Sequence, residues 1–199
     1  MTKIKLCGLS REEDIKAANI LMPDFIGFVF AEKSKRFISR DKAVNLKKIL
    51  DPKILSTGVF VDEKIEIVAE YLENNLIDLA QLHGNEDEIY IKNLRKFTDK
   101  PIIKAFKIKN EKNLLEAEKS TADYVLLDAG AGDGKIFDWS LIKNFNRPYF
   151  LAGGLNPENV AEAVKKLNPF AVDVSSGIEV NLIKDPEKMK KFVKKVRGS

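Results

Sequence analysis

The chain has 199 residues, of which 44% are hydrophobic and 32% charged, a composition typical of a globular protein with a hydrophobic core and one that excludes wholesale disorder. Its 34 basic and 30 acidic residues leave a net charge of +4, which is too small to indicate nucleic-acid binding without clustering. One cysteine, Cys7, and one histidine, His83, exclude a disulfide framework and a metal site built from several cysteines or histidines.

The hydrophobic residues occur in short runs along the whole chain. No run reaches the roughly 18 apolar residues that a membrane-spanning helix requires, so we expect no membrane contact. The opening residues, Met1–Leu6, contain no charged region followed by an apolar signal core, which favours a cytoplasmic location. Because no linker or composition break is found, we expect a single domain over residues 1–199.

Eight apolar runs, each as long as a strand that is buried on both faces, alternate with amphipathic stretches. In chain order the runs are Ile4–Cys7, Phe25–Phe30, Ile54–Val61, Ile77–Leu82, Ile102–Phe106, Tyr124–Leu127, Tyr149–Ala152 and Phe170–Val174. Eight strand–helix units most simply close into a (β/α)8 TIM barrel, here of near-minimal length. The alternative is an open doubly wound sheet, but the first run is followed by Gly8-Leu9-Ser10 and lacks the G-x-G-x-x-G phosphate loop of that fold.

Helix start signals lie between the runs. Ser10 and Glu13 have the spacing of a capping box. Asn156 and Asp185 each precede a proline, a pattern typical of an N-cap residue followed by the first helical residue. After Asp185, the apolar residues of Met189–Val196 have helical spacing, which predicts a final helix.

Polar residues gather where the apolar runs end, and the carboxyl ends of barrel strands form the active site in this fold. The candidates are Cys7, Asp62, His83, Asp128 and Asp173, with Lys35 and Arg36 after the second run. Each has a structural interpretation as well. Cys7 could be a small buried hydrophobic residue, Asp62 a helix cap, His83 a hydrogen-bonded structural histidine, and Asp128 a loop-bonding carboxylate.

Small residues follow the last two runs, at Gly153-Gly154 and Ser175-Ser176-Gly177. Small side chains let backbone N–H groups approach a phosphate, and this end of the barrel is the usual phosphate site. The glycines could serve only as turns, but their position after consecutive runs is better explained by phosphate binding. We assign the phosphate to Gly154, Ser176 and Gly177, with Gly153 and Ser175 in support.

The same run ends resemble those of the phosphoribosylanthranilate isomerase family, from Lys5-Leu6-Cys7-Gly8 to Lys184-Asp185. The shared segments between them are Gly27–Phe30, Ser34–Arg36, Gly58–Phe60, Gln81–Gly84, Asp128, Gly132–Trp139, Ala152–Leu155 and Val172–Glu179. The resemblance implies a (β/α)8 barrel of tryptophan biosynthesis that catalyses an Amadori rearrangement of N-(5′-phosphoribosyl)anthranilate. It also implies that neither a metal nor an organic cofactor is used.

Residue roles follow from the resemblance. Cys7 matches the general base, Asp128 the general acid, and Arg36 a substrate-binding arginine near the anthranilate carboxylate. A carboxylic acid can protonate the ring oxygen as the furanose opens, and a thiolate can remove the carbon-2 proton if nearby cations make it accessible. We expect His83 and Asp173 to contact the substrate, Asp173 through sugar hydroxyls or by orienting the loops.

The chain departs from the family pattern in two loops. Asp133 stands where the family usually has a small hydroxyl residue, and it would raise the pKa of Asp128 if it pointed inward. The segment Asn181–Asp185 lacks the glycine often found before the Lys-Asp pair. Neither departure removes a proposed catalytic group.

Other functions remain open from the sequence. Another phosphosugar barrel enzyme is one alternative, such as the related isomerase of histidine biosynthesis, an epimerase or an aldolase. An epimerase would need several histidines, and a Schiff-base aldolase would use Lys104. A non-catalytic phosphosugar-binding barrel would be marked by loss of Cys7 or Asp128. We expect a small-molecule phosphosugar as the partner, a monomer or homodimer, and no nucleic-acid contact, because the lysines of 190–195 are spaced as a solvated helix face.

Overall fold

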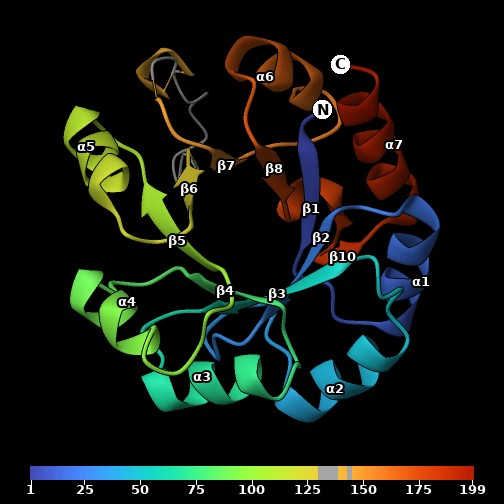
Figure 1. The fold of residues 1–199 in the computed structure, drawn as a ribbon. Coiled ribbons are helices and arrows are strands. Elements are labelled where there is room, and N and C mark those ends of the chain that lie inside the picture. Colours follow the sequence, from blue (N-terminus) through green and yellow to red (C-terminus); the bar gives the residue numbers. More distant parts are fainter. Residues whose placement is uncertain (130–138, 143–144) are drawn as a thin grey trace.

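The computed structural model describes residues 1–129, 139–142 and 145–199. Eight parallel strands form a closed barrel in chain order, and helices surround it on the outside (Figure 1). This arrangement confirms the (β/α)8 barrel and rules out the open sheet. The strands are β1 (Lys3–Cys7), β2 (Phe25–Val29), β3 (Leu55–Phe60), β4 (Leu79–Leu82), β5 (Ile102–Lys107), β6 (Tyr124–Asp128), β7 (Tyr149–Ala152) and β8 (Ala171–Val174).

The outer layer consists of helices that connect one strand to the next and of a final helix that follows β8. They are α1 (Glu12–Leu21), α2 (Arg40–Lys48), α3 (Ile65–Glu73), α4 (Glu88–Leu94), α5 (Glu111–Lys119), α6 (Val160–Leu167) and α7 (Pro186–Arg197). In the connection after β6, the described residues form the 3-10 helix η1 (Trp139–Ile142) in place of the expected α-helix. Asp133 lies outside the described residues. None of the described helices is long and apolar enough to span a membrane.

The start of α1 differs from the predicted capping box. Arg11 is the N-cap residue, and the Asp14 carboxylate accepts hydrogen bonds from the backbone N–H groups of Ser10 and Arg11 at 2.9 and 3.0 Å. The prediction of Ser10 and Glu13 as the capping pair was therefore wrong. Asp14 takes over because it also binds the Arg11 guanidinium, which fixes its carboxylate over the free N–H groups.

The two Asx-Pro signals have different outcomes. Asp185 caps α7 as predicted, because its side chain accepts a hydrogen bond from the Lys188 N–H at 2.9 Å. Asn156 instead caps a turn that precedes α6, and the helix itself begins only at Val160. The sequence pattern was therefore correct for α7 and placed the start of α6 too early.

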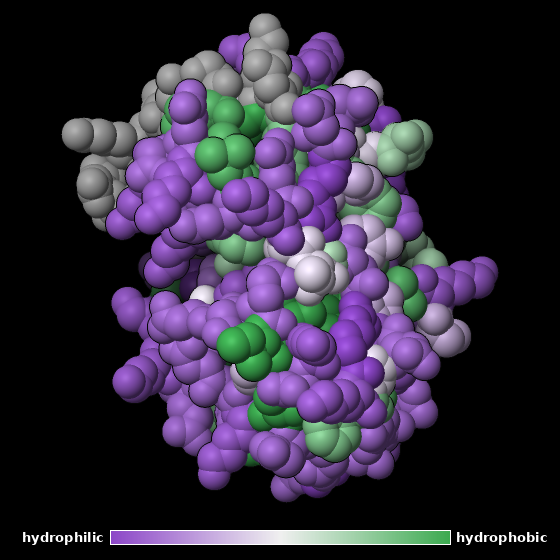
Figure 2. Space-filling model, turned by 60° about the vertical axis from the view of Figure 1, so that its left-hand side comes forward, coloured by the Kyte–Doolittle hydropathy of each residue, from purple (hydrophilic) through white to green (hydrophobic). Residues whose placement is uncertain are grey.

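Strand alternation divides the hydrophobic residues between two cores. Phe25, Ile103, Leu126 and Phe150 point into the barrel and pack there, whereas the alternate strand residues pack against the helices. The final helix contributes Phe192 to the outer core and lies beside α1 and α6 (Figure 1). The face in Figure 2 is mainly hydrophilic, with small separate hydrophobic patches, so the bulk of the apolar surface lies in these cores.

A short hairpin follows β8 and leads into α7. Its strands are β9 (Glu179–Val180) and β10 (Ile183–Lys184), and Lys184 pairs with Glu179 across it. The turn residues Asn181 and Leu182 are both left-handed, with φ of 51° and 66°. The turn keeps this conformation without the family's glycine, at a cost of about 1–2 kcal/mol for the leucine.

Candidate active site

A cavity of 350 Å³ opens at the carboxyl ends of the strands. It is lined by every residue assigned above to catalysis, substrate binding or phosphate binding except Gly177, and it does not include the candidates Lys35 and Asp62. The assigned residues that line it are Cys7, Arg36, His83, Asp128, Gly153, Gly154, Asp173, Ser175 and Ser176. Because they come from the ends of β1, β4, β6, β7 and β8 and from the loop after β2, only barrel closure brings them together.

Gly177 is required for packing and is absent from the lining of this cavity. A Cβ atom at Gly177 would lie 2.0 Å from the Leu155 carbonyl oxygen, so only glycine lets the loops after β7 and β8 meet. Gly154 is different, because a Cβ there would meet nothing within 4 Å, while its φ of +69° favours glycine. The assignment of the Gly177 backbone N–H to the phosphate stays a prediction, because the crowding at its Cα concerns the side-chain direction and not the N–H group.

Lys5 lies inside the barrel beside Cys7. Its side chain is fully buried, and its Nζ donates a hydrogen bond to Asp173 Oδ1 at 3.0 Å across the β1–β8 pair. Lys5 and Cys7 are two residues apart on β1, so both point to the interior, as alternation predicted. Asp173 is thus held by Lys5 while it also lines the cavity.

The Cys7 thiol is subject to opposing influences. Burial is the strongest and raises the pKa of the thiol above its ordinary value, while the charges of Lys5 and Lys184 lower it. Burial also acts to lower the pKa of Lys5, but Asp173 and Cys7 outweigh it, and the net pKa of Lys5 is raised. Lys5 therefore stays charged and is the nearest source of stabilisation for a thiolate.

His83 joins the ends of β4 and β6. Its Nδ1 lies 2.8 Å from Gln81 Nε2, and its Nε2 lies 3.4 Å from Asp128 Oδ2. Gln81 and His83 are two residues apart, so both point inward from β4. Through this contact His83 orients the carboxylate that the sequence analysis assigns as the acid.

Arg36 is held by Glu179 and Lys184, for which the sequence predicted no role. Glu179 binds the Arg36 guanidinium through both carboxylate oxygens, at 2.6 and 2.7 Å, and Lys184 Nζ lies 2.5 Å from Glu179 Oε1. Glu179 and Lys184 both belong to the segments that the chain shares with the family. No local signal pairs them with Arg36, because 143 residues separate Arg36 from Glu179.

Ser175 is engaged by the protein itself. Its hydroxyl donates a hydrogen bond to the Cys7 carbonyl oxygen at 3.1 Å, and its own carbonyl oxygen accepts one from Lys184 Nζ at 3.0 Å. These bonds tie the loop after β8 to the end of β1. Ser176 lines the cavity next to Ser175.

Asp62 links two loops in place of capping a helix. Its carboxylate accepts a hydrogen bond from the Asn85 backbone N–H at 2.6 Å, whereas the N-cap position of α3 is occupied by Lys64. The structural interpretation of Asp62 as a helix cap was therefore wrong, because its carboxylate is bonded to the loop after β4.

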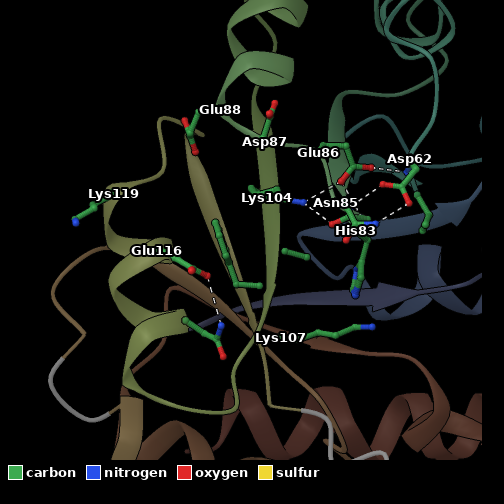
Figure 3. Close-up of a pocket in the computed structure, with 15 residues that line it drawn as sticks. Asp62, His83, Asn85, Glu86, Asp87, Glu88, Lys104, Lys107, Glu116 and Lys119 are labelled. Atoms are coloured by element: carbon green, nitrogen blue, oxygen red, sulfur yellow. Dashed lines mark hydrogen bonds and ion pairs between the residues drawn. The ribbon is translucent and has the colours of Figure 1, made fainter.

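A second cavity, of 710 Å³, lies beside the first over β4 and β5 and shares Val61 and His83 with it. In Figure 3, Lys104 and Glu86 point toward one another at its wall. Lys104 Nζ lies 2.9 Å from Glu86 Oε2 and 2.8 Å from the Gly84 carbonyl oxygen. Lys104 alternates with the inward-facing Ile103, so it lies outside the barrel and away from Cys7.

Comparison with known proteins gives similarity over the whole chain. The family model for N-(5′phosphoribosyl)anthranilate (PRA) isomerase matches residues 4–195. The N-(5′-phosphoribosyl)anthranilate isomerase of Endomicrobium trichonymphae is 49% identical over 203 residues, covering 100% of both chains. The phosphoribosyl anthranilate isomerase of Thermotoga maritima superposes with a TM-score of 0.92 at 36% identity, covering 100% of each chain. A structure of such an isomerase in complex with reduced 1-(o-carboxyphenylamino)-1-deoxyribulose 5-phosphate superposes with a TM-score of 0.89, at 36% identity and 100% coverage of both chains.

Proposed function

We propose that this chain, which belongs to the N-(5′-phosphoribosyl)anthranilate isomerase family, converts N-(5′-phosphoribosyl)anthranilate into 1-(2-carboxyphenylamino)-1-deoxyribulose 5-phosphate in tryptophan biosynthesis. One observation carries the proposal. Cys7 and Asp128, a base and an acid from strands on different sides of the barrel, line the same 350 Å³ cavity. A single sugar bound there can exchange protons with both groups.

The reaction begins at the ring oxygen. Asp128, in its protonated form, donates a proton to the furanose oxygen as the bond between that oxygen and carbon 1 breaks. The electron pair of the bond stays on the oxygen, and the nitrogen lone pair forms an iminium with carbon 1. His83, at 3.4 Å from Asp128, orients the carboxyl group for this transfer.

The second proton transfer uses Cys7. The iminium acidifies the carbon-2 proton, which the Cys7 thiolate accepts, and the bonding electrons neutralise the iminium to give an enolamine. That enolamine then gains a proton at carbon 1 and loses one from the carbon-2 hydroxyl to give the ketone product. Lys5 supports the thiolate, since its buried ammonium opposes the effect of burial on the Cys7 pKa.

Substrate binding is divided between two ends of the cavity. Arg36 meets the anthranilate carboxylate, and the backbone N–H groups of Gly154, Ser176 and Gly177 meet the phosphate, with Gly153 and Ser175 forming the loops around them. Asp173 holds Lys5 and faces the sugar. A phosphate beside Asp173 would be repelled, which supports placing the phosphate over Gly154 and Ser176.

The alternative functions have weaker support. Lys104 lies outside the barrel in an ion pair with Glu86, which leaves a Schiff-base aldolase without an amine at the cavity that holds Cys7. A non-catalytic barrel would not need both Cys7 and Asp128 in one cavity. A phosphosugar of histidine biosynthesis fits the same rearrangement, and its turnover by the purified chain is the separate measurement that tests this alternative.

We also propose that the protein works in the cytoplasm on a small-molecule phosphosugar, as a monomer or homodimer. The family's place in amino-acid biosynthesis supports the location. Light scattering of the purified chain tests the oligomeric state.

The decisive experiment uses the purified chain with a chelator and N-(5′-phosphoribosyl)anthranilate, and follows the loss of substrate fluorescence. We expect a rate proportional to enzyme concentration. The same mixture without protein serves as the control for spontaneous substrate decay. A rate no higher than that of the control would overturn the proposal.

A further inference from the structure

The Arg36 guanidinium is fixed by other residues of the protein. Its Nε donates to Glu179 Oε1 at 2.6 Å and its Nη2 donates to Glu179 Oε2 at 2.7 Å. Two parallel hydrogen bonds of this kind fix the plane of a guanidinium as well as its position. They occupy the edge formed by Nε and Nη2 and leave Nη1 outside these two bonds, while Arg36 also lines the cavity.

Lys184 gives the cluster its net charge. Its Nζ lies 2.5 Å from Glu179 Oε1, and its side chain is only 2% exposed. Glu179 alone would neutralise Arg36, and an anion would then meet a pair with no net charge. With Lys184 included, two cations and one anion leave a charge of +1 beside the cavity, which favours an anionic ligand.

The stem of Arg36 is also confined. A Cβ atom at Gly8 would lie 2.6 Å from Arg36 Cδ, so the glycine after β1 leaves the room that this side chain occupies. At the backbone, the Arg36 N–H donates to Ser34 Oγ at 3.1 Å. Arg36 is thus held by its own loop, by Gly8 and by the β9–β10 hairpin.

We propose that Glu179 and Lys184 are positioning residues that hold Arg36, with a net positive charge, for the ring carboxylate of the substrate. The inference rests on the proposed function, in which Arg36 meets that carboxylate. It adds that recognition of the carboxylate depends on the hairpin after β8, which contains no residue assigned to chemistry. A purely structural role for the hairpin would affect all ligands of the cavity alike.

The test compares two inhibitors that differ only at the carboxylate. One is the reduced product analogue, 1-(o-carboxyphenylamino)-1-deoxyribulose 5-phosphate with its carbonyl reduced, and the other is its phenylamino counterpart without the carboxylate. Inhibition constants are measured for Glu179→Gln, Glu179→Asp and Lys184→Met, together with KM and kcat. Glu179→Asp keeps the charge and shortens the side chain, so it tests geometry in a variant that retains the ion cluster.

We expect both Glu179 variants to weaken the carboxylate inhibitor by about tenfold or more and the other inhibitor by less than about twofold, because only the first makes charge-assisted hydrogen bonds to Arg36. Lys184→Met should weaken both inhibitors, since Lys184 also holds Ser175 of the phosphate loop, and should weaken the carboxylate inhibitor more. KM should rise more than kcat falls. Glu86→Gln, which disrupts the buried pair with Lys104 outside this cavity, is the matched control and should leave the ratio of the two constants unchanged.

Equal weakening of both inhibitors, or an unchanged ratio in all three variants, would overturn the role of Glu179 and Lys184. Failure of the proposed function gives a different result. In that case the unmodified protein shows no turnover, or Arg36→Met leaves the ratio unchanged.

Discussion

The Lys5 ammonium donates a hydrogen bond to Asp173 Oδ1 at 3.0 Å in the barrel interior, where the Lys5 side chain is fully buried. A buried ion pair of this kind is costly to assemble and costly to break from one side. Lys5 is two residues before Cys7 on the same strand, so the pair affects the ionisation of the thiol. Lys5 keeps a positive charge close to the Cys7 thiol, and the Asp173 carboxylate pairs with that charge.

The first prediction concerns Lys5→Met. Removing the ammonium leaves burial and Asp173, which both raise the pKa of the Cys7 thiol, opposed by the charge of Lys184 and no longer by that of Lys5. Formation of the thiolate should therefore move to higher pH than in the unmodified protein. Thiolate absorbance in the ultraviolet measures this directly, because Cys7 is the only cysteine in the sequence.

Lys104→Met is the matched control for that measurement. Lys104 is also a buried strand lysine paired with a carboxylate, but it lies outside the barrel. Its replacement should not change the pH at which the Cys7 thiolate forms. An unshifted titration in Lys5→Met, or an equal shift in both variants, would contradict the role of Lys5.

Replacing the base should separate chemistry from binding. Cys7→Ala removes the group that we propose accepts the carbon-2 proton, so kcat should fall by about 10²–10⁴-fold. The affinity for the reduced product analogue should stay within about threefold, because the ring carboxylate and phosphate contacts remain. Steady-state kinetics and calorimetry measure the two quantities. Turnover near that of the unmodified protein would remove Cys7 from the mechanism.

The acid has a comparable test. Asp128→Asn keeps the shape of the side chain but cannot donate an acidic proton to the ring oxygen, so kcat should fall by about 10²–10⁴-fold. A substrate analogue that already has an open chain does not need this proton, and its conversion should be much less affected. Equal losses for closed and open forms would show that Asp128 acts at another step.

Two glycines of the site should differ in their contribution to stability. Gly177→Ala places a Cβ atom 2.0 Å from a backbone oxygen that cannot rotate away, so the free energy of unfolding should fall by about 3 kcal/mol. Gly154→Ala meets no neighbour within 4 Å and only strains a left-handed residue, at a cost of about 1 kcal/mol. Urea denaturation measures both. A larger loss at Gly154 would contradict the packing role of Gly177.

Glu179 should make the free energy of unfolding depend on pH in the acidic range. Burial acts to raise the pKa of Glu179, but its bonds to Arg36 and Lys184 outweigh that effect, and the net pKa is lowered from its ordinary value of 4.5. A lowered pKa in the folded state means that the ionised carboxylate stabilises the fold above that ordinary value. The contribution is lost as the pH falls through the lowered pKa.

We therefore expect the free energy of unfolding to decrease below about pH 4.5, and to decrease less in Glu179→Gln, which has no group to protonate. Denaturation curves between neutral pH and pH 3 measure the difference. An identical pH dependence in both proteins would show that Glu179 gains no stabilisation from its partners.

Local patterns were sufficient for the barrel and for much of the site. A strand buried on both faces requires a short apolar run, and each of the eight runs overlaps a strand of the structure. Polar residues such as Cys7 and Asp128 stand out because they end these runs. Since parallel strands place their carboxyl ends at one face, the sequence alone predicted that both would meet there.

Tertiary structure decided the partners of those residues. Lys5 with Asp173, and Arg36 with Glu179, are separated by 168 and 143 residues, and their meeting depends on barrel closure and strand register. The same holds for Gly177, whose need for glycine comes from the Leu155 carbonyl of another loop. Periodicity records which side of its own element a residue faces, and the sequence could therefore determine the fold and the two catalytic candidates. The charges and backbone atoms that face them belong to distant segments, and only the folded barrel brings these together.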